Sequence, residues 1–256
     1  MRAISHKISL VLLCSGLAHA SFAEEQYSDE VGVERSIASA EALTVSEVLQ
    51  HPDFDALPKT NPMIQVIIEI EALKAGNPEM SDRQLVMIIG QRLKHMNRAR
   101  GHARNSVSSV YDQWQNLTTA EQILVATHPA NAALTYMTKD LAYELTQTHQ
   151  GRNGLGDPSD AFRHAIWNAI MSRYISKSWA EDFATAHEDK TEDELNQTAA
   201  DGYSEREHKA MDLHNNEQGR DCWSVWTDTI ITTSDEDLVE RVKEKLSQDK
   251  LIWLHP

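Results

Sequence analysis

One segment of the chain, residues 157–169, combines a nearly continuous apolar surface with Asp, Arg, His and Asn side chains. It opens with Asp157 and Pro158, a typical N-cap and a typical first helical residue, so it predicts a helix. A helix that is apolar on most sides is normally buried. Buried polar groups cost free energy unless they are hydrogen-bonded, paired or bound to a metal. The fold must therefore bring other polar residues against this helix.

Two later segments, 186–188 and 211–220, can supply those residues. Helical spacing puts the polar residues of each segment on a restricted arc that can face the first helix. Gly219 has no side chain on its arc, so another backbone or a ligand can approach closely there. The candidate site residues are Arg163, His164, Trp167, Asn168, His187, Glu188, Asp212, Asn215, Asn216, Gly219 and Arg220.

Each of these residues also has a purely structural interpretation. Asp160, near the start of its helix, can stabilise free N–H groups and the helix dipole, or can serve as a ligand. His164 can be a satisfied core histidine, and Arg163 and Arg220 can form structural ion pairs. The accumulation of such groups on largely apolar helices exceeds what packing requires, and this favours a site.

A metal centre is one chemistry that these residues suit. His164, His187 and Asp212 can form a His-His-Asp ligand set with an open position for water, which suits a divalent ion such as zinc. The chain lacks the His-Glu-x-x-His motif of one large zinc-protease class.

Two metal-free chemistries fit the same residues. In one, His164 or His187 is a general acid or base while Arg163 or Arg220 holds a phosphate. In the other, Glu188 and Asp212 are a carboxylate pair that cleaves glycosidic bonds.

Residues 1–23 predict a cleaved export signal. Arg2 and Lys7 flank the start of a short apolar run, and small residues precede possible cleavage sites after Ala20 and Ala23. The run is too short to span a bilayer. Cleavage leaves Cys222 as the one cysteine, which excludes an intrachain disulfide. We expect a periplasmic or secreted protein.

The charge of the chain argues against some classes of partner. Its net charge is −15, and loss of the two basic residues of the signal leaves 22 basic against 39 acidic residues, or −17. A chain this acidic is a poor general binder of nucleic acid or of an anionic membrane surface. No segment after the signal has the apolar length of a transmembrane helix. The sequence indicates neither a substrate nor an oligomeric state.

The rest of the chain predicts an all-α fold. We expect an acidic, partly ordered lead-in over 24–60, an N-terminal helical region over 61–116 and a helical domain over 117–256 that carries the polar motifs. Strand signals are scarce, although a β-branched run leaves a strand possible within the first of these helices. The expected helices are 62–75, one from Ser81, one from a capping box at Thr118, one from about 130 to 147, 179–190, 204 to about 226, and 235–247.

Residues 83–111 form a basic stretch, with six Arg or Lys residues and no Asp or Glu. It fits either a patch for an anionic ligand or a solvated helix face, and we favour the solvated face.

The three motifs together, DAFRHAxWNA, AHE and MDxxNNxxGR, resemble an uncharacterised helical domain of bacterial exported proteins. Similar domains stand at the ends of some large surface or toxin-like proteins. The likeness covers about 117–232 and leaves 24–116 outside. No reaction is established for that family, so the resemblance implies a shared site formed by the candidate residues without naming a substrate.

These observations predict an exported all-α hydrolase that acts on an envelope or environmental polymer or lipid. His164, His187 and Asp212 would bind a metal or share acid-base work, and Glu188 would be a second base. The asparagines would orient these groups, and Arg163 and Arg220 would hold an anion. The alternative is a non-catalytic envelope module in which the same residues form a structural polar network.

Overall fold

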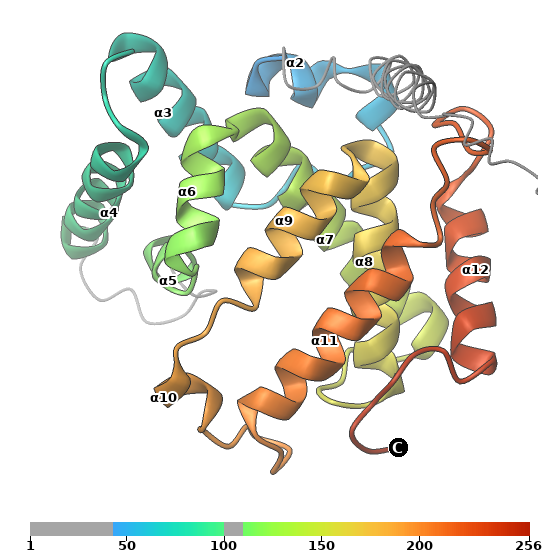
Figure 1. Cartoon of the computed structure of the whole chain (residues 1–256). Helices are drawn as coiled ribbons and strands as arrows, with labels where there is room; N and C mark the ends of the chain where they lie inside the picture. The colour runs from blue at the N-terminus through green and yellow to red at the C-terminus, as the bar shows by residue number, and fades with distance from the viewer. Residues whose placement is uncertain (1–42, 100–109) are drawn as a thin grey trace, which may run out of the picture. The chain divides into compact units, whose positions relative to one another are not determined.

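A computed structural model describes residues 43–99 and 110–256. Within these two stretches it contains eleven α-helices, one 3-10 turn and no strand, so the expected all-α fold is confirmed (Figure 1). The elements are α2 (Val45–Gln50), η2 (Pro52–Phe54), α3 (Met63–Gly76), α4 (Asp82–Ala99), α5 (Val110–Gln115), α6 (Thr119–Thr127), α7 (Pro129–Gln150), α8 (Pro158–Tyr174), α9 (Lys177–His187), α10 (Glu192–Leu195), α11 (Glu205–Arg220) and α12 (Asp235–Ser247).

The expected signal peptide and the lead-in up to residue 42 lie outside the described residues. The end of the lead-in, 43–60, forms α2 and η2 and buries Val45, Val48, Phe54 and Leu57 in the hydrophobic core. None of the helices in the described residues combines the length and the low polarity needed to cross a bilayer.

The sequence leaves two features of the N-terminal half undecided: whether the β-branched run is a helix or a strand, and whether the basic stretch is a solvated face. The β-branched run forms the helix α3, because its helical spacing buries Ile64, Ile67 and Ile70 on one core face. The basic residues Arg83 and Lys94 are exposed on α4, which agrees with a solvated face. Part of the basic stretch, residues 100–109, lies outside the described residues.

Local capping sets the start of most of the later helices. Thr118 forms the expected capping box with Glu121, and the Asp157 carboxylate accepts the N–H groups of Ser159 and Asp160 at the start of α8. The predicted bounds of α12 are confirmed.

The helix of the third motif ends earlier than expected. It begins after the N-cap Ser204, but it ends at Arg220 and does not continue to about Trp226. The chain turns there because Trp223 enters the core and because the Asp228 carboxylate accepts the backbone N–H of Ser224. The side chain of Trp226 is left 66% exposed.

Helix α8 occupies the centre of the domain, in contact with α7, α9, α11 and α12 (Figure 1). Most of its residues are buried, as its sequence predicts. It crosses α11 closely at Gly219, where an added Cβ would lie 2.1 Å from the carbonyl oxygen of Ala165. The expectation of a close approach at Gly219 is therefore confirmed, and the approaching group is the backbone of α8.

The segment 251–256 packs against the start of α8. Asn215 on α11 pairs with the backbone of Ile252, donating to its oxygen at 2.8 Å and accepting from its nitrogen at 3.0 Å. The backbone nitrogens of Leu254 and His255 donate to the oxygen of Gly156 at 2.7 and 3.2 Å. This segment thus holds the loop that precedes the central helix.

Candidate functional site

Three ionisable side chains from α8 and α11 converge in the interior. Nε2 of His164 lies 3.4 Å from Oδ1 of Asp160 and 3.2 Å from Oδ1 of Asp212. One turn of α8 separates Asp160 from His164, and the crossing of α8 with α11 brings Asp212 to the same nitrogen. One ligand atom from each residue lies within 4.8 Å of the other two, so the group could hold a metal ion.

The Asp160 carboxylate is fixed from several sides. Its Oδ2 accepts the backbone N–H of Gly156 at 2.6 Å, and its Oδ1 contacts the guanidinium of Arg163. Burial on its own raises the pKa of Asp160, but the interactions with His164, Arg163 and Gly156 outweigh burial and lower it. Asp160 is therefore a buried, ionised and oriented carboxylate.

A relay of side-chain amides determines which nitrogen of His164 carries hydrogen. Arg220 only donates, so its contact with Asn168 at 3.2 Å identifies the amide atom there as oxygen. The NH₂ of Asn168 then donates to Oδ1 of Asn216 at 2.7 Å, which makes that oxygen an acceptor. Nδ1 of His164, 3.3 Å from the same oxygen, must carry hydrogen. Nε2 is left to face the two carboxylates.

Asp212 is the least satisfied member of the group. It is 7% exposed, and its Oδ1 has no hydrogen-bond partner within the described residues despite its short distance to His164. Burial raises the pKa of Asp212, His164 opposes this effect, and the carboxylates of Glu188 and Asp160 add to it. A buried carboxylate in this position requires a positive partner.

The pKa of His164 is also raised. Burial alone would lower it, but the carboxylates of Asp212 and Asp160 stabilise the imidazolium and outweigh burial. The pKa values of both His164 and Asp212 are raised, so these two groups together hold a proton strongly. Without a metal, this proton supplies the positive charge that lies between the carboxylates.

Glu188 lies beside this group at the end of α9. It is 2% exposed, its Oε2 has no hydrogen-bond partner in the described part of the chain, and it acts electrostatically on Asp212. The sequence-based choice of Glu188 as a residue near Asp212 thus has a structural counterpart, while its role stays a prediction.

The expected His-His-Asp set is wrong in one member, because His187 does not lie with the ligand atoms of His164 and Asp212. Its Nδ1 lies 2.8 Å from Oε1 of Glu121, and its ring stands edge-on to Trp167 at 5.9 Å. Glu121 reaches it because the capping box of α6 holds the other oxygen of that carboxylate. Asp160 takes the third place in the group.

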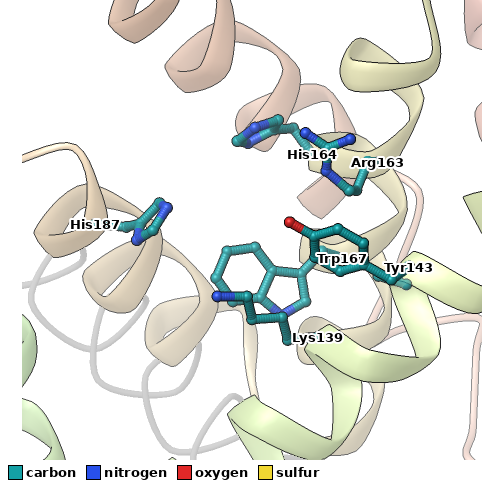
Figure 2. Close-up of a pocket in the computed structure, with 7 residues that line it drawn as sticks. Lys139, Tyr143, Arg163, His164, Trp167 and His187 are labelled. Carbon is teal, nitrogen blue, oxygen red and sulfur yellow. The ribbon is translucent and has the colours of Figure 1, made fainter. Parts of the chain in front are cut away.

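A pocket of about 110 Å³ connects His187 with the buried group. Figure 2 shows its side chains, which come from α7, α8 and the end of α9 and surround a common space. The pocket is lined by Lys139, Ala142, Tyr143, Arg163, His164, Trp167 and His187. His164 therefore belongs both to the buried group and to the pocket wall.

Other candidates have positions that account for them structurally. Asn215 is fully buried and holds the backbone of Ile252, away from His164. Gly219 permits the helix crossing, and Arg220 orients Asn168.

Several site residues are absent from the sequence-based candidate set. Asp160 is one of them: the sequence allows it to be a helix-start carboxylate or a ligand, and its i, i+4 spacing puts it on the same side of the helix as His164. Lys139, Tyr143 and Glu121 had no such signal, because their positions depend on how α6 and α7 pack against α8 and α9.

A family described as "Domain of unknown function (DUF6973)" matches residues 122–250, just over half of the chain. The chain belongs to this family. The match begins and ends later than the expected likeness over 117–232. The chain matches neither a curated protein nor a solved structure.

The DUF6973 domain contains every member of the buried group and every residue that lines the pocket. Glu121 and the segment 251–256 flank it on either side. The site thus lies within the part of this chain that matches the family, and Glu121 and the segment 251–256 adjoin that part.

Proposed function

We propose that this protein is an exported, metal-assisted hydrolase whose metal ligands are Asp160, His164 and Asp212. A divalent ion such as zinc suits one nitrogen and two carboxylate ligands. The substrate would be an ester, phosphodiester or glycoside in a polymer or lipid of the cell envelope or the environment.

The spacing of the three ligand atoms carries this proposal. A charge-assisted bond between imidazolium and carboxylate is normally about 2.7–2.9 Å long. The distances of 3.2 and 3.4 Å from Nε2 of His164 are longer, and Oδ1 of Asp212 makes no hydrogen bond. Tetrahedral zinc, with ligand distances of about 2.0–2.2 Å, holds neighbouring ligand atoms roughly 3.3–3.5 Å apart. The two distances from Nε2 therefore match those between ligands of a shared ion, and all three ligand atoms lie within 4.8 Å of one another.

The orientation of His164 supports the same conclusion. Metal-binding histidines commonly donate their second N–H to an oxygen, which fixes the tautomer and the ring. Here Nδ1 donates to Asn216, whose oxygen is fixed by Asn168 and Arg220. Nε2 thus presents its lone pair between the two carboxylates when the proton is displaced.

The surrounding residues suit the two proton transfers of a hydrolysis. A bound divalent ion would supply Lewis acidity and lower the pKa of a water molecule. Glu188, buried beside Asp212, would take the proton of the attacking water as its OH joins the substrate. His187, oriented by Glu121, would donate the proton that the leaving oxygen needs when its bond breaks.

The alternative of a structural polar network also has an observation in its favour. The relay from Arg220 through Asn168 and Asn216 to His164 satisfies its amide groups, as a specificity-giving core network would. It leaves Oδ1 of Asp212 and Oε2 of Glu188 without hydrogen bonds among the described residues, which such a network would not require.

Metal content and hydrolysis of simple chromogenic esters test the proposal. Protein purified without chelator should contain about one divalent ion per chain, and Asp212→Asn should contain none. Chelator should abolish hydrolysis, and zinc or manganese should restore it. If wild type and Asp212→Asn both lack metal and metal addition restores nothing, the structural alternative replaces the enzyme.

The export proposal has its own test. Because small residues precede both cleavage positions, the mature chain should begin at Ser21 or Glu24, and should be found in a periplasmic or secreted fraction. Intact-mass measurement of the natural protein checks this, and retention of residues 1–20 would contradict it.

A further inference from the structure

The pocket beside the buried group has a basic lining in an acidic protein. Its titratable lining residues are Lys139, Arg163, His164, His187 and Tyr143, with no carboxylate among them (Figure 2). The chain as a whole carries a net charge of −15. A local excess of cationic groups within an acidic protein attracts an anion to that position specifically.

Most of these cations already have a carboxylate partner outside the pocket, and Lys139 is the exception. Arg163 contacts Asp160, and His187 contacts Glu121. Lys139 is half-buried and forms no ion pair within 4 Å among the described residues. The neighbouring Asp140 attracts Lys139 electrostatically without forming an ion pair, and it accepts from the Asn61 amide at 2.9 and 3.1 Å. The Lys139 ammonium therefore remains available to a ligand.

One side chain of the pocket has a buried donor that no group of the described residues satisfies. Nε1 of Trp167 is buried without a hydrogen-bond partner in the described structure, and Trp167 lines the pocket. The Arg163 guanidinium stacks over the Tyr143 ring at 5.1 Å, which fixes two lining groups relative to each other. The pocket thus combines, in a small volume, an ion-paired guanidinium, two imidazoles, a phenol and an ammonium that has no ion pair in the described part of the chain.

We propose that this pocket binds the phosphate group of the substrate, so that the hydrolase acts on phosphate esters. Donors of different shape, an ammonium, a guanidinium, an imidazole and a phenol, suit a tetrahedral group with several acceptor oxygens better than a planar carboxylate. The inference rests on the proposed function, because Arg163 and His164 belong to both the pocket and the metal group.

The reaction then takes a defined form. The OH of one water joins phosphorus, the bond from phosphorus to the leaving alcohol oxygen breaks, and that oxygen receives a proton. Lys139 contacts oxygens of phosphorus that do not react, so it contributes to binding rather than to proton transfer.

Calorimetric titration of the full chain with inorganic phosphate, after chelator treatment, tests the pocket without metal. Lys139→Gln should weaken phosphate binding roughly tenfold or more, because it removes one charge-assisted contact. Lys94→Gln, a matched loss of charge on the exposed face of α4, should leave the affinity unchanged. Circular dichroism of each variant checks that the fold is retained.

The outcomes separate this inference from the proposed function. Asp212→Asn should lose metal yet still bind phosphate, because its carboxylate does not line the pocket. If phosphate binds only to metal-loaded protein and Lys139→Gln binds as wild type does, the pocket is not the phosphate site. Absence of phosphate binding at millimolar concentration would also overturn it, whatever the metal content.

Two phosphate sources can then be distinguished with the same variant. A Lys139-dependent affinity for glycerol 3-phosphate indicates a soluble phosphate ester. A Lys139-dependent affinity for phosphatidylglycerol vesicles, with phosphatidylcholine vesicles as reference, indicates a lipid. Either result supports a phosphate pocket.

Discussion

Nε2 of His164 and Oδ1 of Asp212 lie 3.2 Å apart, yet the carboxylate oxygen makes no hydrogen bond. The Asn216 contact holds the imidazole ring from the other side, so it is not free to turn toward Asp212. Nε2 of His164 and Oδ1 of Asp212 thus both face the same space without being hydrogen-bonded to each other. An ordinary buried ion pair would be hydrogen-bonded, whereas two ligands of the proposed metal need not be, and the first two predictions depend on this difference.

Metal binding should stabilise the wild type against heat. An ion at 100 times its dissociation constant adds about 2.7 kcal/mol, which raises the melting temperature. Asp160→Asn and His164→Ala each remove a ligand, so the same concentration of zinc should have little effect on their melting temperatures. Differential scanning calorimetry with and without chelator makes the comparison. An equal shift in all three proteins would mean that zinc binds elsewhere.

Without metal, Asp212→Asn should not destabilise the protein and should increase its free energy of unfolding. The substitution removes a buried negative charge that lies near the carboxylates of Asp160 and Glu188. Residues of functional sites are often not optimal for stability, so replacing one can raise the free energy of unfolding. Asn216→Ala should instead cost roughly 1–3 kcal/mol, because Asn168 and His164 lose their shared acceptor. Urea unfolding in chelator measures both. Destabilisation by Asp212→Asn to the same extent would favour the structural network.

The helix crossing should not tolerate a side chain at Gly219. Gly219→Ala places a methyl group 2.1 Å from the oxygen of Ala165, so we expect a loss on the order of 3 kcal/mol or a displaced helix. Gly76→Ala is the control, because its added Cβ meets nothing within 4 Å and alanine favours a helix by about 0.5–1 kcal/mol. Urea unfolding again gives the comparison. Equal stability of both variants would show that the crossing can relax.

The contact between Glu121 and His187 should matter for turnover more than for stability. Glu121→Gln can keep the capping box with Thr118, since glutamine also serves at that position. It no longer offers His187 a carboxylate, so ester hydrolysis should fall at least about tenfold in kcat with little change in melting temperature. Unchanged kcat would remove His187 from the proton-transfer role.

Acid should weaken the packing of α12 through one ion pair. Arg241 holds the Asp228 carboxylate with two hydrogen bonds and lowers its pKa to about 2. A lowered folded-state pKa contributes stability above the unfolded value of 3.8, and that stability is lost as the pH falls toward 2. Asp228→Asn should flatten stability over this range, and Arg241→Gln should do likewise. A profile unaffected by either variant would contradict this.

Local sequence signals predicted much of the fold and part of the site. Caps such as Thr118 and Asp157 act over three or four residues, so they are visible in sequence. The i, i+4 spacing of His164 and Asn168 likewise marked one inward face. The partner of His187 was not predictable, because Glu121 reaches it only through the packing of α6 against α9.

The contacts of the loop before α8 could not be predicted from the sequence. Gly156 donates to Asp160 and accepts from Leu254, so Asp160 is positioned by a segment far along the chain. No local pattern connects these residues. The sequence therefore predicts that Asp160 lies on the same side of its helix as His164, but not that Gly156 and Leu254 hold it there.

The contacts that hold the loop before α8 have a consequence for the order in which the protein folds. The contact between Leu155 and His255 closes a separation of 100 residues, and the one between His164 and Asn216 closes 52. Closing long loops costs chain entropy before any contact rewards it, so such contacts form slowly. We expect helices to appear early in refolding and zinc affinity to be regained only with the slowest phase. A chain can then have nearly full helical content before the residues of the proposed metal site have come together.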